Sequence, residues 1–274
     1  MTKQDDPKAI VDSVLSSRKY HSLYRPTVER IVTTLSDRYL PKQLEHEVRR
    51  KLHQIWGAYF TRPNFSKLFE HFREGLSLGT PDRDLLLPLL RLQTSTNERI
   101  PLLPEFYSRI FELTGTPNTV VEYGCGVNAL TYPWMGDGIT YTGFDVDTEL
   151  MNFINDIFTK MNVSKKAQVK LGDLLDGVYE KADVTLFLKV LVLFERQREG
   201  VSRGILEAVP SRYIVVSFPT KSITGKERGM KKHYTELFAE LVEGTGWKTK
   251  SVEFESEIVF IIDKGGRSDR QKEK

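Results

Sequence analysis

The chain has 274 residues, of which 39% are hydrophobic and 28% charged, and its formal net charge is +3. These values are typical of a globular protein with one large domain or two ordinary ones. No run approaches the ~18–20 apolar residues of a membrane span, and the amino terminus lacks a signal-peptide core. The single cysteine, Cys125, excludes a disulfide, an all-cysteine zinc site and an iron–sulfur cluster, so we expect a cytoplasmic protein without a metal.

Positive charge is concentrated near the amino terminus. Residues 8–62 hold eleven lysines and arginines against five acidic residues, so the remainder of the chain is net negative. A basic segment joined to a neutral or acidic one favours a polyanion-binding module beside a catalytic one. The alternative is a solvated helical face without a ligand, and charge alone does not separate the two.

The first 114 residues are expected to be helical. Each of the first three helices is expected to begin at a proline, namely Pro7, Pro26 and Pro41. The third helix has an apolar face formed by residues at helical spacing, namely Leu44, Val48, Leu52 and Ile55. Further helices are expected over about 64–78, 82–94 and 101–114.

From residue 116 onward, β-rich apolar runs alternate with helical stretches. Strands are expected within 119–124, 139–147, 167–173, 183–191, 213–220, 247–254 and 257–264. This alternation predicts an α/β, Rossmann-like domain with a parallel sheet, and the short turn before the last strand predicts a closing antiparallel hairpin. We therefore expect an all-α helical-bundle domain over 1–115, an α/β domain over 116–264 and a disordered tail over 265–274.

The run VVEYGCGVNAL, residues 120–130, places a glycine-rich turn directly after the first strand. Gly124 and Gly126 fit the loop of a dinucleotide-binding domain and equally the loop that holds S-adenosylmethionine (SAM). Glu122 favours SAM, because a carboxylate there can bind the methionine ammonium but repels a pyrophosphate. Pro133 also disturbs the regular helix that a dinucleotide requires.

Two later strand ends carry acidic residues in the order that a SAM site requires. Asp145, after the second strand, suits the ribose hydroxyls, although this position does not discriminate between the cofactors. Asp173, after the third strand, suits the exocyclic amine of adenine, with Leu174 packing beside the ring. The ordered set favours a SAM-dependent methyltransferase domain, with turn-forming acids as the alternative.

The methyl acceptor is constrained mainly by what the sequence lacks. The fourth strand ends Phe187-Leu188-Lys189, without the proline-aromatic run of amino-directed enzymes, and Cys125 lies in the cofactor loop rather than opposite the methyl group. No residue is an evident catalytic base. A ring nitrogen with a free lone pair, such as guanine N7, needs only placement in line with the methyl group.

The sequence resembles the aminoglycoside-resistance 16S rRNA (guanine(1405)-N(7))-methyltransferases over almost its whole length. The segments that carry the resemblance are KLHQIWGAY at 51–59, TSTNER at 94–99, CGVN at 125–128, Leu188-Lys189, SFPTKS at 217–222 and Gly229-Met230. The resemblance implies methylation of a decoding-site guanine in 16S rRNA of the assembled 30S subunit, with aminoglycoside resistance as the consequence. We expect a monomer.

The resemblance also implies roles for individual residues. It implies that Arg99 holds the SAM carboxylate and that Asp145, Asp173, Leu174 and Lys189 line the cofactor pocket. It implies that rRNA phosphates contact basic residues of two segments, namely Arg18, Lys19, Arg49, Arg50 and Lys51, then Lys221, Lys226 and Arg228. It places Phe218, Lys221, Met230 and Tyr234 near the target base, where Phe218 or Tyr234 could stack on a flipped nucleotide.

Several positions depart from the family pattern. They are Ala129 in place of proline, His233 in place of asparagine, Ala239 in place of an acid, and Glu255-Ser256-Glu257 in place of Gly-Asn-Glu. A diverged homologue that methylates another rRNA site is therefore a second hypothesis. A non-catalytic RNA-binding factor with a relic SAM fold, a small-molecule methyltransferase and an NAD-dependent oxidoreductase are further alternatives.

Overall fold

The computed structural model describes residues 6–57, 63–76, 83–177, 179–220 and 229–265. Seven strands in these ranges form one sheet, namely β1 (Thr119–Tyr123), β2 (Thr140–Asp145), β3 (Ala167–Leu171), β4 (Val184–Leu188), β5 (Tyr213–Pro219), β6 (Lys248–Glu253) and β7 (Glu257–Asp263). The strand order is β3-β2-β1-β4-β5-β7-β6. Neighbours among β1–β5 pair in parallel, whereas β7 is antiparallel to both β5 and β6. The predicted parallel sheet and closing hairpin are confirmed.

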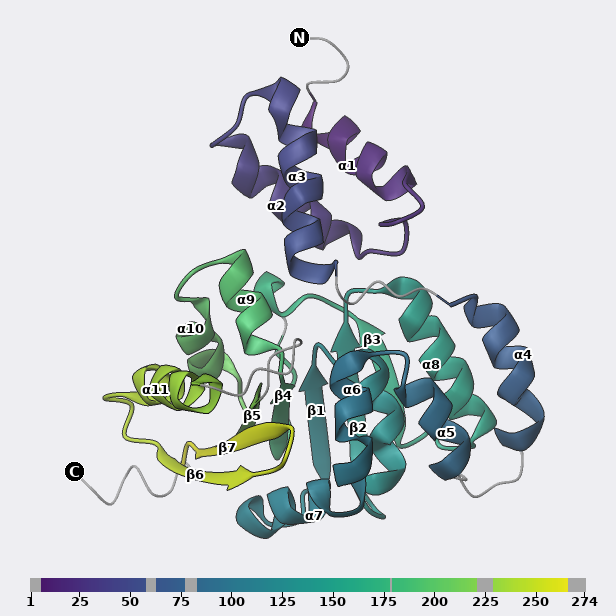
Figure 1. Ribbon diagram of the computed structural model, residues 1–274, viewed down its shortest axis with the longest axis vertical. Helices are drawn as coiled ribbons and strands as arrows, with labels where there is room; N and C mark the ends of the chain where they lie inside the picture. The colour runs from purple at the N-terminus through teal and green to yellow at the C-terminus, as the bar shows by residue number, and fades with distance from the viewer. Residues whose placement is uncertain (1–5, 58–62, 77–82, 178, 221–228, 266–274) are drawn as a thin grey trace.

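Helices cover both faces of the sheet (Figure 1). One face packs against α5 (Arg83–Leu90), α7 (Leu103–Thr114), the 3-10 helix η3 (Gly126–Trp134) and α8 (Thr148–Lys160), with α4 (Phe65–Leu76) outside α8. The other face packs against α9 (Leu191–Gln197), α10 (Val201–Ala208) and α11 (Met230–Val242). The strands are apolar on both sides because both faces are covered.

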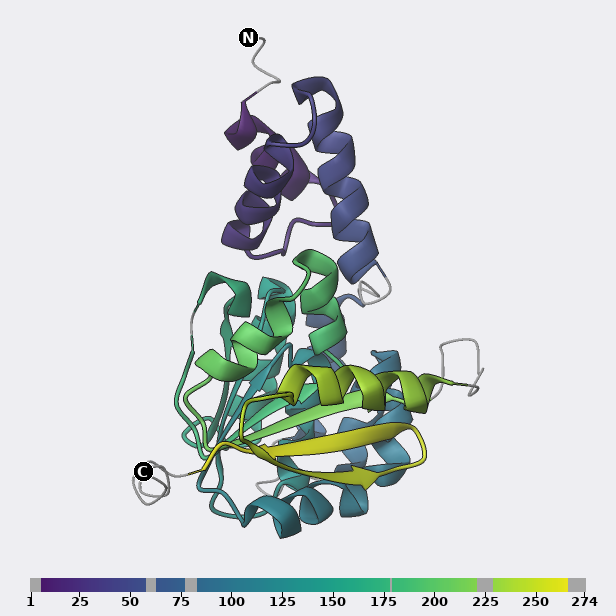
Figure 2. The ribbon, with the colours of Figure 1, turned by 90° about the vertical axis from the view of Figure 1, so that its left-hand side faces the viewer.

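The first three helices, α1 (Pro7–Ser16), α2 (Arg25–Ser36) and α3 (Pro41–Trp56), form a bundle with its own hydrophobic core. Each has a proline in its first turn, as predicted, and the apolar face expected on α3 is buried. The bundle stands at one end of the molecule, beyond the carboxyl ends of the parallel strands (Figures 1 and 2). We call it the α1–α3 bundle.

The remaining helices before the sheet pack on the sheet rather than on the bundle. Hydrophobic residues of α5 and α7 belong to the same core as β1. The segment expected to be one helix over 82–94 is interrupted, because α5 ends at Leu90 and a short helix, α6 (Thr94–Arg99), follows, continued by the 3-10 helix η2 (Ile100–Leu102). The predicted boundary at residue 115 stays a prediction, and residues 266–274 of the expected tail lie outside the described ranges.

Contacts from the α1–α2 connection, from α2 and from α3 join the bundle to the sheet domain, the last through the Lys51 ammonium and the Arg196 carbonyl of α9. After α1, the Tyr24 amide donates to the Val146 carbonyl, the Thr148 amide donates to the Ser22 carbonyl, and Leu23 pairs with Asp147. From α2, side chains reach the turn after β3. No helix in the described ranges is both long and apolar enough to cross a membrane.

Candidate functional site

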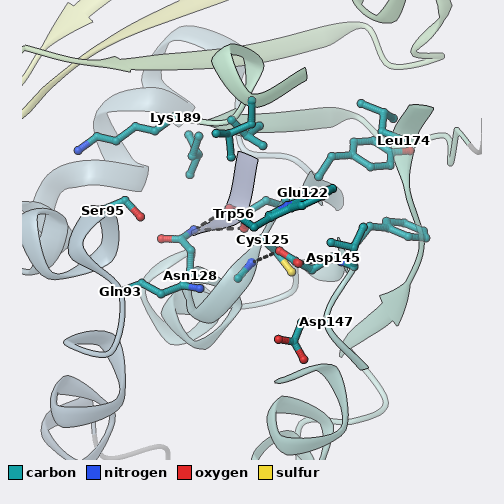
Figure 3. A pocket seen from close by; sticks show the side chains of 18 of the residues that line it. Trp56, Gln93, Ser95, Glu122, Cys125, Asn128, Asp145, Asp147, Leu174 and Lys189 are labelled. Atoms are coloured by element: carbon teal, nitrogen blue, oxygen red, sulfur yellow. Dashed lines mark hydrogen bonds between the residues drawn. The ribbon is translucent and has the colours of Figure 1, made fainter. Parts of the chain in front are cut away.

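A pocket lies at the carboxyl ends of β1–β4, on the side that faces the bundle (Figure 3). Its empty space, which opens to solvent, is about 1060 Å³. Its walls come from the strand ends, from α6 and α9, and from Leu23 and Trp56 of the α1–α3 bundle. Open α/β sheets bind ligands at this edge, and all eight residues predicted to bind the cofactor line this pocket, namely Arg99, Glu122, Gly124, Gly126, Asp145, Asp173, Leu174 and Lys189.

The loop after β1 depends on its two glycines. Gly124 and Gly126 have φ values of +68° and +47°. A Cβ atom on Gly124 would lie 2.4 Å from Cγ2 of Val190, and one on Gly126 would lie 2.3 Å from Oε1 of Gln93. Both positions therefore exclude a side chain. Cys125 between them is buried, which raises the pKa of its thiol well above the ordinary value, so it packs as a small apolar residue.

Glu122 lies at the floor of the pocket and accepts hydrogen bonds from within the protein. Asn128 Nδ2 donates to its two oxygens at 2.9 and 3.1 Å (Figure 3), and the Tyr141 hydroxyl donates to Oε2 at 2.7 Å. Burial raises the pKa of Glu122 to about 7, against the opposing effect of these donors. Three of about four lone-pair positions are used, which leaves one acceptor for a cationic ligand.

Arg99 is buried close to Glu122. Its guanidinium forms a two-pronged pair with Glu257 of β7, at 2.7 and 2.9 Å, and donates to Asn128 Oδ1 at 2.6 Å. These contacts use three of its five N–H groups and leave two for a ligand carboxylate.

Asp145 and Asp147 at the end of β2 differ in environment. Asp145 accepts from the Gly126 amide at 2.8 Å and from the Val146 amide at 2.7 Å. Burial raises the pKa of Asp145 to about 6. Asp147 caps α8 through the Glu149 and Leu150 amides, so the turn-forming interpretation holds for Asp147, although both acids line the pocket.

Asp173 and Leu174 follow β3 and are both buried. Asp173 Oδ1 accepts from the Leu175 amide at 2.9 Å, and Oδ2 accepts from Thr27 at 2.7 Å and pairs with Arg30. Neither partner in α2 could be identified from a local sequence pattern.

Lys189 directly follows β4 and has a φ of +59°, a value that residues other than glycine rarely adopt. Its backbone amide donates to the Ser217 carbonyl and hydroxyl, and its ammonium pairs with Glu98 Oε2 at 2.8 Å. This conformation directs the side chain across the pocket toward α6, which carries Ser95 (Figure 3). Strained backbone of this kind gathers at functional sites.

The expectation for Phe218 as a base-stacking residue is wrong. Phe218 is fully buried, with Tyr234 stacked on it at a centroid distance of 4.8 Å and Phe260 against its edge. Tyr234 is half-buried in α11, where Met230 is the first residue. Lys221, Lys226 and Arg228 lie outside the described residues.

The basic residues predicted to bind RNA in the bundle fall into two groups. Arg18, Lys19 and Arg50 are exposed. Arg49 pairs with Glu45 at 2.8 Å, and the Lys51 ammonium donates to the Arg196 carbonyl of α9. Arg49 and Lys51 therefore stabilise contacts within the protein, and so do Arg50, which pairs with Glu47, and Lys19, whose ammonium contacts His53 Nδ1 at 2.8 Å.

Several residues at the pocket were missed by sequence reasoning. They are Gln93, Glu98, Asn128 and Glu257, with Trp56, Thr27 and Arg30 from the bundle. Asn128 follows the second glycine of the loop at a fixed spacing and could have been found. No group of three or more histidines, cysteines or acids within the described part of the chain is arranged to hold a metal ion.

The polar groups of the pocket fit SAM. Glu122 and Arg99 are adjacent and opposite in charge, as a methionine ammonium and carboxylate require. Asp145 and Asp173 follow at successive strand ends for the ribose and the adenine amine, and Leu174 supplies apolar contact. These spare donors and acceptors are in a buried setting, where a partner is needed to offset desolvation.

Comparisons with known proteins agree with this assignment. The model of the family described as ribosomal RNA methyltransferase (FmrO) matches residues 16–261. A 16S rRNA (guanine(1405)-N(7))-methyltransferase of Proteus mirabilis is 35% identical over 268 residues, with 92% of this chain and 95% of the relative covered. One from Micromonospora rosea is 31% identical, with 96% and 98% covered. The crystal structure of the 16S rRNA methyltransferase RmtF with S-adenosyl-L-homocysteine has a TM-score of 0.78 and 27% identity over 96% of this chain and 99% of that one.

Proposed function

The chain belongs to the ribosomal RNA methyltransferase (FmrO) family, and on that premise we propose that it transfers the methyl group of SAM to N7 of guanine 1405 of 16S rRNA. The observation that carries the proposal is the pocket, in which Glu122 and Asp145 lie at the carboxyl ends of β1 and β2 and Asp173 follows β3, with the spare acceptors that SAM requires. The relatives match over more than nine-tenths of the chain, so both the bundle and the sheet domain take part in the comparison.

The reaction needs orientation more than proton transfer. When bound, SAM supplies an electrophilic methyl carbon. The lone pair of guanine N7 forms the new N–C bond while the S–C electron pair returns to sulfur, so no proton leaves the base. Lys189 and the loop of Gly124 and Gly126 border the pocket where the reacting groups meet, and we assign them to positioning. Placement in line at about 3 Å supplies the rate enhancement.

The substrate is reached through the bundle and α11. Guanine N7 lies on the major-groove edge, which is inaccessible in regular A-form RNA, so the target nucleotide has to be opened or flipped. Arg18, Lys19 and Arg50 supply exposed positive charge on the bundle for rRNA phosphates. Lys221, Lys226 and Arg228, with Met230 and Tyr234, are proposed to approach the target base. Phe218 supports Tyr234 from beneath.

The proposed substrate is the assembled 30S subunit, and the protein acts as a monomer in the cytoplasm where ribosomes work. Methylation adds a methyl group and a positive charge at the decoding site, and the expected consequence is resistance to aminoglycosides that bind there. The α1–α3 bundle forms the RNA-docking part, and residues 116–264 form the catalytic part together with α5, α6 and α7, because α5 and α7 pack on the sheet and α6 carries Arg99 to the pocket.

The departures from the family pattern leave the pocket chemistry intact. Ala129 is fully buried and apolar, and Glu257 is fully buried as the partner of Arg99. His233 and Ala239 lie exposed on α11. A difference in target choice would therefore originate on the surface of α11 or at the β6–β7 turn, where Glu255 is exposed and Ser256 contacts the Glu98 carbonyl, and this observation favours a diverged rRNA target as the second candidate function.

The deciding experiment uses purified protein, unmethylated 30S subunits and methyl-labelled SAM. Chemical cleavage at 7-methylguanine followed by primer extension maps the product. A single break at guanine 1405 is the expected result. Label without that break would indicate another rRNA site, and saturable SAM binding without any label would leave a relic fold.

A further inference from the structure

The α1–α3 bundle contributes two side chains to a residue of the cofactor pocket. Asp173 lines the pocket after β3 and is 3% exposed. Thr27 of α2, itself fully buried, donates its hydroxyl to Asp173 Oδ2 at 2.7 Å, and the Arg30 guanidinium pairs with the same oxygen. A residue of the catalytic domain is thus oriented by a different structural unit.

These contacts leave Asp173 with one open acceptor. A carboxylate has about four lone-pair positions. Thr27 and Arg30 occupy those of Oδ2, and the Leu175 amide occupies one on Oδ1 at 2.9 Å. The open position is therefore on Oδ1, and its direction is fixed by the partners on the other oxygen.

Arg30 is itself held in place by two further groups. Its Nε donates to Asp176 Oδ1 at 3.2 Å, and its second terminal nitrogen donates to Gln197 Oε1 at 3.1 Å as well as to Asp173. Asp176 belongs to the 3-10 helix η4 (Leu174–Asp176), and Gln197 ends α9 and lines the pocket. The guanidinium therefore bridges α2, η4 and α9, and its planar fork restricts the orientations that Asp173 can take.

A second set of hydrogen bonds holds the α1–α3 bundle against the part of the pocket that is assigned to the ribose. The Tyr24 amide donates to the Val146 carbonyl at 2.8 Å, and the Ser22 hydroxyl donates to Asp147 at 2.7 Å. These contacts directly follow Asp145. The bundle thus abuts both acids assigned to the adenosine half of the cofactor.

We propose that Thr27 and Arg30 are positioning residues that hold the Asp173 carboxylate so that its open lone pair meets the exocyclic amine of adenine. The inference rests on the proposed function, because it takes the cofactor to be SAM with adenine beside Asp173. Neither residue contacts the cofactor. The bundle is also the proposed rRNA-docking unit. A change in α2 is therefore expected to alter the affinity for the cofactor and the affinity for the rRNA together.

The test compares two ligands that differ at the atom in question. S-adenosylhomocysteine carries the amine, whereas S-inosylhomocysteine carries a carbonyl oxygen there and presents an acceptor to Asp173. Isothermal calorimetry measures the affinity of both for the wild type, Thr27→Val and Arg30→Met. The wild type is expected to prefer the amine ligand by roughly tenfold or more, and the variants to lose about tenfold in its binding and most of the preference.

The control is Arg38→Met, which removes the same charge from an exposed residue just beyond α2. It should leave the preference unchanged. Thr27→Val is nearly isosteric and keeps the test valid where Arg30→Met fails to fold, which thermal unfolding would reveal.

Three results separate the possibilities. Equal weakening of both ligands with an unchanged preference would show that Thr27 and Arg30 only dock the bundle, and would overturn the inference. A wild type that binds both ligands equally would remove Asp173 from adenine recognition, while the proposed function would stand. A wild type that binds neither SAM nor S-adenosylhomocysteine would refute the proposed function itself.

Discussion

Arg99, which lines the pocket, forms a fully buried ion pair with Glu257 that joins α6 to β7. The two N–O distances are 2.7 and 2.9 Å, and the side chains are 1% and 0% exposed. Burial alone would raise the pKa of Glu257, but the Arg99 guanidinium holds it below its ordinary value. The closing hairpin therefore supplies the counter-charge for the residue proposed to hold the SAM carboxylate.

Replacing Glu257 by alanine should destabilise the protein strongly. The change leaves the Arg99 guanidinium buried without its partner, which costs about 3–5 kcal/mol in comparable cases. The free energy of unfolding in urea measures the loss. Glu253→Ala on the neighbouring strand breaks an exposed pair with Lys231 and should cost at most about 1 kcal/mol. Equal losses for the two variants would contradict the structural role of the buried pair.

Cofactor binding should depend on pH through Glu122. Burial raises the pKa of Glu122 to about 7, and a ligand with an ammonium group favours the ionised carboxylate. Binding below pH 7 must therefore release a proton, so the affinity for S-adenosylhomocysteine should rise as pH increases from about 6 to 8, by up to about tenfold per pH unit. Asp145, with a pKa of about 6, extends the effect to lower pH.

The stability of the ligand-free protein should change in the opposite direction. Because the folded pKa of Glu122 lies above its ordinary value of 4.5, its contribution is fully present below about pH 4.5 and is lost as pH rises through 7. Glu122→Gln should weaken binding at pH 8 and flatten the pH profile. Titration calorimetry across pH 5.5–8.5 tests both binding expectations, and urea unfolding over the same range tests the stability trend. A binding profile that is equally steep in the variant would exclude Glu122 as the titrating group.

Much of the pocket could be predicted from the sequence because it is built from strand ends. Glu122, Asp145 and Asp173 each close a β-rich run, and parallel strands bring their carboxyl ends to one edge. Their partners could not be predicted in the same way. Thr27 lies 146 residues from Asp173, and nothing local in α2 distinguishes a buried threonine that serves a distant carboxylate.

The assignment of Phe218 shows a different reason for failure. The resemblance of its run, SFPT, to the family places Phe218 in the target-base region. The strand β5 is central, with β4 and β7 on either side, and five consecutive residues up to Phe218 are buried. A continuous apolar run is typical of such a strand, so the pattern itself already favoured a core role.

The backbone of Lys189 should be relaxed by glycine. Lys189→Ala and Lys189→Gly both remove the ion pair with Glu98, but only glycine tolerates a φ of +59°. The glycine variant should be more stable than the alanine variant by about 1 kcal/mol. Thermal and urea unfolding of the pair measure this difference.

The same two substitutions at Lys232 provide a control of opposite sign. Lys232 is an exposed residue inside α11, where glycine should be less stable than alanine by about 1 kcal/mol. If glycine and alanine rank in the same order at both positions, the strain at Lys189 contributes nothing measurable. Methylation should fall in both Lys189 variants, because each loses the side chain that crosses the pocket.

Substrate binding and cofactor binding should separate in Lys221→Glu. This prediction rests on the resemblance of the run at 217–222, which places Lys221 near the target nucleotide. A negative charge there repels rRNA phosphates, so 30S binding and methylation should fall sharply while affinity for S-adenosylhomocysteine stays constant. In a plot of log affinity for 30S against log salt concentration, losing one phosphate contact should reduce the slope by roughly 0.7–0.9.

The matched control is Lys160→Glu, which makes the same change of charge at the end of α8, on the edge of the sheet opposite the pocket. It should leave both the salt slope and methylation near wild type, because the charge lies far from the proposed rRNA path. A similar loss in the two variants would mean that net charge, rather than a local contact, governs 30S binding. Lost cofactor affinity with intact 30S binding in Lys221→Glu would instead move Lys221 from the target-base region to the cofactor site.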